Sequence, residues 1–239
     1  MPIGRPGVDL TAVIDLAAIA RNVRAAQASA PLPLLADVRH DALGHGLVEV
    51  ARAALDAGAT GLLTSITETD AARAAFPSAT VVAASVTGEA PEGWSLASGE
   101  LYGLPGSGGE PVLRALGRVV NVKPVRAGEG VSYGYIHRAT VDSRLALVTG
   151  GYAQGVVRGL GSAAEVAING RRLPIVGRVA MDVCVVDLGD APAGVGNAVV
   201  YLGTGPAEPT LADWAAVTGL DPAELVVQVA ARFEKRYVS

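Results

Sequence analysis

Several ionisable side chains lie close together near position 40. His40, Asp41 and His45 fall within six residues, directly after the apolar run 34–38, which is typical of a buried strand. In barrel-type folds made of βα units, sites usually lie where the strands end. These three residues could transfer a proton or supply two metal ligands, but no third ligand stands nearby. We therefore treat the segment as a candidate site and predict no metal there.

Arginine carries nearly all of the positive charge. Lysine occurs only at Lys123 and Lys235, so any chemistry that needs a side-chain amine must use one of these two. Arg39 could hold a carboxylate or a phosphate through two hydrogen bonds. Alternatively, Arg39 could form an ion pair with Asp37 or Asp41 at the end of the strand.

The first half of the chain alternates short apolar runs with alanine-rich amphipathic stretches. This pattern is typical of successive βα units around a parallel sheet. The segment 87–109 interrupts it, because it is rich in Gly, Pro, Glu and Ser. The predicted strands are 13–16, 34–38, 61–66, 80–86 and a short one at 98–104, and the predicted helices are 17–29, 47–57 and a third that starts at a Thr67 cap and ends near residue 76.

The second half predicts a compact antiparallel β domain. Asn169-Gly170 lies between two strand candidates, and this dipeptide favours a tight hairpin. Two helices follow, one after a Thr210 cap and one after Pro222. The predicted strands are 119–125, 145–148, 164–168, 175–186 and 198–202, and the predicted helices are 211–218 and 223–233.

Composition favours a small-molecule protein. The net charge is −4, and the basic residues are scattered, so the sequence gives no sign of binding nucleic acid or a membrane surface. No run approaches the roughly 18 apolar residues of a membrane helix, and we expect a cytoplasmic protein. Cys184 is the only cysteine, so a disulfide within the chain and a cysteine-based metal site are excluded. Its valine neighbours predict a packed core thiol.

Several segments together resemble the alanine racemase family. AVIDLAAIARNVR (12–24) is similar to the family's opening strand and helix, VRHDALGHG (38–46) to its cofactor-lysine segment, and GELYGLP (99–105) to the end of its last barrel strand. The longest resemblance runs over 122–187 and includes AGEGVSYG, GGYAQGVVRGL, INGRRLPIVGRVAMD and VVDL, and 224–238 resembles the C-terminal helix and tail.

The resemblance implies roles for residues of the second half. A tyrosine of the partner subunit's β domain is one of the family's two catalytic bases, and Tyr152 occupies its place, although Gln154 replaces an aspartate. Arg178, Met181 and Asp182 also match the family, whose Met-Asp pair approaches the substrate carboxylate. We therefore expect substrate contacts from these last three residues.

The resemblance also implies a pyridoxal phosphate cofactor, but the expected lysine is Arg39. A guanidinium does not form an imine with an aldehyde. Leu43 and Ala223 stand where the family has tyrosines near the phosphate, and Leu96 or Ala97 stands where it has an arginine at the pyridine nitrogen. We therefore expect that pyridoxal phosphate is not bound and predict no cofactor.

The predicted barrel is too short to close. A closed (β/α)₈ barrel typically needs about 250 residues, whereas the predicted barrel-like domain spans only 1–117. The simplest account is an internal deletion around 86–96. We expect an α/β plus all-β protein, with an incomplete (β/α) TIM-barrel-like domain over 1–117 and an antiparallel β domain over 118–239. Its exposed sheet edge would stay open or be covered by dimerisation.

Three functions follow from this resemblance. The first is a dimeric binding, scaffold or regulatory protein. The second is a cofactor-independent enzyme that transfers protons on a small amino- or keto-acid-like substrate, with Tyr152, Arg39, Asp41 and His45 as catalytic residues. The third, an ordinary pyridoxal-phosphate racemase, would need an imine without a lysine at position 39. The family's head-to-tail dimers imply a homodimer, and a mixed dimer with a full-length racemase is the alternative.

Overall fold

The structure is a computed structural model that describes residues 10–84 and 90–239 of the chain. No helix in these two ranges is long and apolar enough to cross a membrane. The last two residues of the predicted strand 80–86 lie outside the described residues, and the strand β4 is seen over Thr80–Ala84.

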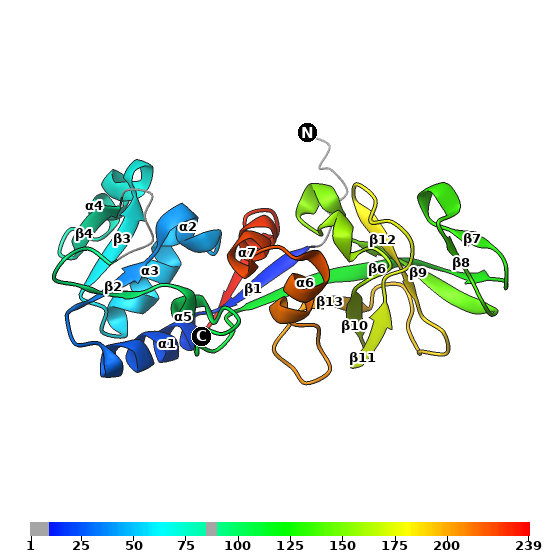
Figure 1. Cartoon of the computed structure of the whole chain (residues 1–239), viewed down its shortest axis with the longest axis horizontal. Helices are drawn as coiled ribbons and strands as arrows, with labels where there is room; N and C mark the ends of the chain where they lie inside the picture. The colour runs from blue at the N-terminus through cyan, green and yellow to red at the C-terminus, as the bar shows by residue number, and fades with distance from the viewer. Residues whose placement is uncertain (1–9, 85–89) are drawn as a thin grey trace. The chain divides into compact units, whose positions relative to one another are not determined.

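The described residues group into two units, and Figure 1 labels their elements. We call Ile14–Leu113 together with Lys235–Ser239 the α/β unit. The β unit consists of Arg114–Glu234 and the described residues up to Val13. The predicted domain ranges, 1–117 and 118–239, stay predictions.

Two strands run from one unit into the other. They are β1 (Thr11–Asp15), near the start of the described chain, and β14 (Glu234–Val238) at its end. The sequence did not indicate β14, which was expected to be a tail. Its residues from Lys235 onward belong to the α/β unit.

A parallel sheet lies at the centre of the α/β unit. Its strand order among the described residues is β4-β3-β2-β5, and each neighbouring pair is parallel. Besides β4, the strands are β2 (Leu34–Asp37), β3 (Gly61–Ser65) and β5 (Ser95–Ala97). The strand predicted at 98–104 is wrong. That segment forms the short helix α5 (Gly99–Tyr102), which ends at Gly103 with a left-handed φ of 63°.

Polar side chains cap the start of α1 and of the 3₁₀ turn that leads into α4. Asp15 Oδ1 accepts a hydrogen bond from Ala18 N at 2.9 Å at the start of α1 (Leu16–Ser29). The predicted Thr67 cap is wrong, since Ser65 caps the 3₁₀ turn η1 (Ile66–Glu68) and Glu68 completes the capping box. That turn leads directly into α4 (Thr69–Ala75), and α3 (Leu47–Asp56) lies earlier in the chain.

The core of the α/β unit forms where amphipathic helices cover the sheet. Apolar side chains of α1 and α3 pack against those of β2 and β3, which removes them from water and supplies the main stabilising term. The fully buried members include Ile19, Val23, Leu34, Ala36, Val50, Ala51, Leu62 and Leu101.

The β unit is mainly antiparallel, as predicted. Its strands follow the order β11-β10-β13-β6, and β6 also pairs with β9, which pairs with β12. The strands are β6 (Leu113–Val125), β9 (Ser143–Thr149), β10 (Glu165–Ile168), β11 (Arg171–Pro174), β12 (Val183–Asp187) and β13 (Ala198–Leu202), with the small pair β7 (Gly130–Val131) and β8 (His137–Arg138).

One predicted turn of the β unit is confirmed and one predicted strand is wrong. Asn169-Gly170 joins β10 to β11 with positive φ at both residues. The strand predicted over 175–186 is interrupted, because residues 175–182 form a connection before β12 begins. Gly177 has a φ of 74° there, and a Cβ on it would lie 2.3 Å from that of Ser132. The backbone therefore approaches another segment too closely for a regular strand.

The structure of the last two helices and of Cys184 agrees with the predictions from the sequence. Thr210 caps α6 (Leu211–Thr218), and Pro222 is the first residue of α7 (Pro222–Ala230). Cys184 is buried, with its Sγ 3.2 Å from the hydroxyl of Tyr201, and burial raises the pKa of this thiol to about 12. It is a packed core thiol.

Candidate functional site

Arg39 is bound by the carboxylate of Asp37, the last residue of the preceding strand β2. Its Nε donates to Asp37 Oδ1 at 2.7 Å, and its Nη2 donates to Oδ2 at 2.6 Å. The side chains are only 16% and 7% exposed, and the hydrogen bonds to Asp37 raise the pKa of Arg39. Of the two ion pairs that the sequence allowed, the structure contains the one with Asp37. The guanidinium of Arg39 therefore already donates its two parallel hydrogen bonds to Asp37.

Two further side chains fix Asp37. Ser98 Oγ donates to its Oδ2 at 2.9 Å, and the buried hydroxyl of Tyr102 donates to its backbone carbonyl at 2.6 Å. Burial raises the pKa of Tyr102 well above its ordinary value. The end of β2 is therefore tied to the segment that carries β5 and α5.

A left-handed turn, α2 (Arg39–Leu43), follows β2. The residues from His40 to Leu43 have φ between 51° and 58°, a region that costs most residues about 1–2 kcal/mol each. The carboxylate of Glu68 holds this turn by accepting from the backbone N–H groups of His40 at 3.0 Å and Asp41 at 2.5 Å. The strained conformation therefore depends on contacts from outside the turn.

Asp41 links that turn to two other elements. Its Oδ1 accepts from Leu47 N at 2.8 Å at the start of α3, and its Oδ2 lies 3.4 Å from Lys235 Nζ on β14. Tyr237, also on β14, donates its hydroxyl to the backbone carbonyl of His45 at 2.9 Å. Both oxygens of Asp41 are thus engaged.

His45 is buried and neutral. Its Nδ1 lies 2.8 Å from the carbonyl of Ala42, while Nε2 is buried without a hydrogen-bond partner among the described residues. Its ring centroid lies 5.0 Å from that of Tyr102. Burial lowers the pKa of His45 to about 4. No group of three His, Cys, Asp or Glu residues suited to a metal ion occurs in the part of the chain that the structure describes.

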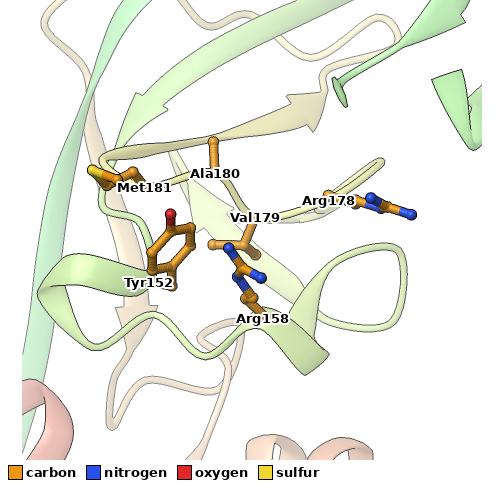
Figure 2. A pocket seen from close by; sticks show the side chains of 6 residues that line it. All are labelled: Tyr152, Arg158, Arg178, Val179, Ala180 and Met181. Atoms are coloured by element: carbon orange, nitrogen blue, oxygen red, sulfur yellow. The ribbon is translucent and has the colours of Figure 1, made fainter. Parts of the chain in front are cut away.

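The other predicted residues lie around a pocket of the β unit. Its volume is about 550 Å³, and Figure 2 shows the six side chains that line it. Tyr152 begins the 3₁₀ turn η3 (Tyr152–Gln154), and its N–H donates to Ala180 O at 3.0 Å. Gly151 permits this approach, because a Cβ there would lie 2.3 Å from Met181 O. The lining residues are Tyr152, Arg158, Arg178, Val179, Ala180 and Met181.

Two arginines give this pocket its positive charge. The guanidinium carbon of Arg158 lies 4.0 Å from the ring centroid of Tyr152, a cation–π contact. Figure 2 shows the guanidinium of Arg178 pointing away from that ring. Neither guanidinium has a hydrogen bond or ion pair within the described residues. The sequence did not indicate Arg158 as a site residue, because Tyr152 and Arg158 lie in two separate short turns, η3 and η4 (Arg158–Leu160), which no regular periodicity relates.

Asp182 is the one predicted substrate contact that does not line the pocket. Its Oδ1 accepts from Gln154 Nε2 at 2.7 Å, while Gln154 Oε1 accepts from Gly151 N at 3.0 Å. Asp182 and Gln154 therefore support the turn that holds Tyr152. The predicted catalytic residues divide between the units: Arg39, Asp41 and His45 lie in the α/β unit and Tyr152 in the β unit.

The chain is similar in sequence to curated alanine racemases. It is 48% identical to the alanine racemase of Mycolicibacterium vanbaalenii over an alignment of 120 residues. This alignment covers 49% of this chain and 31% of that protein. It is 40% identical to the alanine racemase of Frankia casuarinae over an alignment of 147 residues, which covers 61% of this chain and 38% of that protein. The matched segment is thus a little over a third of these relatives' length at most.

Solved alanine racemases share the fold. The structure from Streptomyces coelicolor has a TM-score of 0.87 and 24% identity and covers 97% of this chain and 98% of that one. The structure from Bartonella henselae has a TM-score of 0.84 and 19% identity and covers 97% of this chain and 100% of that one. These likenesses confirm the expected fold class, a (β/α)-barrel-like N-terminal part followed by a C-terminal β domain.

The comparisons contradict the expectation that no pyridoxal phosphate is bound. The relatives are alanine racemases, which are pyridoxal-phosphate enzymes, and the Bartonella henselae structure is described with this cofactor covalently bound. The family therefore points to pyridoxal phosphate. Position 39 offers no amine to it, yet the α/β unit contains one at Lys235, beside Asp41. The expectation of no cofactor was drawn only from the residue types at positions 39, 43, 96, 97 and 223.

Removing Arg39 should destabilise the fold by leaving a buried carboxylate unpaired. We expect Arg39→Met to lower the free energy of unfolding by about 3 kcal/mol, and Asp37→Asn in the same chain to restore part of it. Urea unfolding monitored by circular dichroism measures both. Arg73→Met is the matched control, since the Arg73–Asp70 pair is exposed and its loss should leave stability unchanged. Equal effects of Arg39→Met and Arg73→Met would contradict this account.

Protonation of His45 should make the fold sensitive to acid. Its pKa is about 4 in the folded chain and ordinarily 6.5, so the unfolded state binds more protons between these values. Its contribution, roughly 3 kcal/mol, is complete above about pH 6.5 and is lost as the pH falls toward 4. His45→Asn keeps a donor for Ala42 O but does not titrate. Unfolding free energies measured from pH 7 to pH 4 should fall less steeply for this variant, and parallel profiles would refute the prediction.

Two family models match most of the chain. "Alanine racemase, N-terminal domain" matches residues 14–97, and "Alanine racemase, C-terminal domain" matches residues 112–237, which alone is more than half of the 239 residues. This agrees with the resemblance of the individual motifs and with the shared fold. The chain belongs to the alanine racemase family.

Proposed function

We propose that this chain acts as a dimeric binding protein whose β unit holds the carboxylate of a small amino acid or keto acid. The observation that carries this proposal is the pair of arginines, Arg158 and Arg178, at the 550 Å³ pocket. Neither guanidinium has a hydrogen bond or an ion pair with another described residue, although Arg158 stacks on the ring of Tyr152. A guanidinium whose N–H groups are not bonded to protein acceptors can bind a carboxylate through two parallel hydrogen bonds.

The other lining residues suit a small ligand of this kind. The pocket volume lies within the usual range of small-molecule sites, roughly 300–1,000 Å³. Tyr152 supplies a hydroxyl beside Arg158, and Met181, which is 55% exposed, offers an apolar surface. Because η3 is fixed by backbone hydrogen bonds to residues 180 and 181, the phenol is held in place before a ligand arrives.

The α/β unit gives less support to the proton-transfer function that the sequence allowed. Arg39 is bound to Asp37, Asp41 holds the start of α3 and pairs with Lys235, and His45 is buried. No described contact brings these side chains together as an acid and a base. Binding is therefore the better-supported function of the pocket.

A second copy of the chain is the partner that we propose. The described surface of the β unit exposes the apolar side chains Tyr135 and Ile136 on one turn, at 67% and 58%, and exposed apolar groups of this kind commonly mark interfaces. The head-to-tail dimers that the resemblance to the alanine racemase family implies favour the same partner. A symmetric dimer would use the same face on both copies.

Binding should depend on Arg158. We expect L- or D-alanine, or pyruvate, to raise the melting temperature of the wild-type chain and to give a measurable Kd by calorimetry. Arg158→Ala should weaken that binding about 10- to 100-fold, since a charge-assisted hydrogen bond contributes about 1.5–3 kcal/mol. Tyr152→Phe should weaken it less. Arg171→Ala is the matched control, because Arg171 pairs with Asp190 and does not line the pocket. Unchanged binding by Arg158→Ala would refute the proposed site.

The oligomeric state is measured independently. Light scattering during gel filtration should give twice the mass of the chain, and Ile136→Glu should shift the population toward monomer by placing a charge at the apolar turn. Val195→Glu is the control, because Val195 is also exposed, at 69%. A monomer for the wild-type chain would contradict homodimerisation, and a complex formed only on addition of a full-length alanine racemase would favour the mixed dimer.

A further inference from the structure

The two arginines of the pocket in the β unit come from backbone segments that touch each other. Arg158 begins η4, and Arg178 lies in the connection before β12. The segments meet at Gly161, where a Cβ would lie 2.5 Å from Gly177 O and 3.2 Å from Arg178 Cα. A larger residue at position 161 would push them apart. This glycine therefore allows one pocket to contain two guanidinium groups.

The backbone of Arg178 is held by one serine. Ser132 Oγ accepts a hydrogen bond from Arg178 N at 3.0 Å and donates one to Arg178 O at 3.1 Å. The guanidinium reaches toward the 3₁₀ turn η2 (Tyr133–Tyr135), since its Nη1 lies 4.0 Å from the position that a Cβ on Gly134 would take. The direction of the Arg178 side chain thus starts from a fixed point of the backbone.

The two guanidinium groups lie at different ends of the set of lining residues. That of Arg158 stacks on the ring of Tyr152, whereas Figure 2 shows Arg178 apart from this ring, with its guanidinium directed away from it. A stacked guanidinium still presents its N–H groups in its own plane, so the contact with Tyr152 leaves them available to an acceptor. One small anion therefore does not suit both arginines at once, but two acidic groups on one ligand do.

No acidic side chain lines the pocket to balance the two arginines. Asp182, which follows Arg178 closely in the sequence, is hydrogen bonded to Gln154 and does not line the pocket. The lining residues therefore present two positive charges, and a ligand with two negative charges is their electrostatic complement. The apolar side chains of Val179 and Ala180 suit a short hydrocarbon segment between the acidic groups of such a ligand.

We propose that the pocket binds a dicarboxylic amino acid or the corresponding keto acid, with Arg158 on the α-carboxylate and Arg178 on the side-chain carboxylate. The proposal rests on the proposed function and names the ligand class of the same site. Tyr152 determines the orientation, because its ring stacks on Arg158 and its hydroxyl is a hydrogen-bond partner for the amino or keto group next to the α-carboxylate.

The test compares ligands that differ only in the second acidic group. L-Glutamate and L-glutamine have the same shape, but glutamine carries an uncharged amide in place of the side-chain carboxylate. Calorimetry at pH 7 and constant ionic strength measures the Kd of each ligand for the full chain. We expect glutamate to bind about 10-fold more tightly than glutamine, since its second carboxylate gains charge-assisted hydrogen bonds. L-Aspartate and L-asparagine repeat the comparison with a side chain that is one methylene shorter.

Substitutions of single arginines assign the two carboxylates. Arg178→Gln should weaken the binding of glutamate much more than that of glutamine, so that the preference falls below about 2-fold. Arg158→Gln should weaken the binding of both ligands. Arg171→Gln is the matched control, because it removes the same charge from a residue that pairs with Asp190 outside the pocket, and it should keep the wild-type preference. Light scattering verifies that each variant has the oligomeric state of the wild-type chain.

Several results would overturn the dicarboxylate class. They are equal Kd values for glutamate and glutamine in the wild-type chain, a preference that persists in Arg178→Gln, and a preference that Arg171→Gln abolishes as well. Inorganic phosphate is a further probe. Competition by phosphate at the Kd of glutamate would show that the pocket responds to total charge rather than to two separated carboxylates, and this would also overturn the proposal.

Failure of the proposed function gives a different result. In that case none of alanine, pyruvate, glutamine and glutamate would bind to the wild-type chain. Binding of alanine with no tighter binding of glutamate would instead retain the proposed function and refute the dicarboxylate class.

Discussion

The α/β unit is organised around one nearly buried carboxylate. A charge at the position of Asp37 is costly unless each of its oxygens is hydrogen bonded, and the fold meets this requirement with groups from two places in the sequence. Arg39 donates two hydrogen bonds from the turn that directly follows β2, and Ser98 reaches Asp37 from beyond β5. Satisfying this carboxylate therefore determines how β2 ends, where the segment after β5 lies and why the guanidinium is not available to a ligand.

The strained turn after β2 is held by a second set of polar contacts. Successive residues adopt the left-handed conformation without glycine, and Glu68 satisfies two of the N–H groups that this exposes. Asp41 then connects the turn to α3 and to Lys235. The ionisable side chains of the candidate site and the strained backbone thus lie in one segment, a combination that is common at functional sites. The β unit positions Tyr152 differently, through backbone hydrogen bonds to residues 180 and 181 and through the side chains of Gln154 and Asp182.

Local chemistry made some of these features predictable. The Asn169-Gly170 hairpin and the Thr210 cap depend on neighbouring residues only, and both were recognised from the sequence. The segments 98–104 and 175–182 were wrongly assigned to strands, because their apolar composition fits a strand but Gly103 and Gly177 impose a left-handed backbone. The last residues of the predicted strand 175–186 do form a strand, β12. The ion pair of Arg39 was one of two alternatives, since Asp37 and Asp41 are equally close in sequence. The contact of Arg158 with Tyr152 and the setting of Lys235 depend on tertiary packing that no local pattern encodes.

The contact between Tyr237 and His45 joins residues that are 192 positions apart. Loops of this length close slowly, because the entropy of the intervening chain is lost before the contact forms. As the chain leaves the ribosome, the sheet of the α/β unit can assemble long before the residues that complete the turn at its edge have been made. The β unit must be synthesised in the interval. The turn after β2 is therefore expected to gain its contacts with β14 only after the β unit has been synthesised.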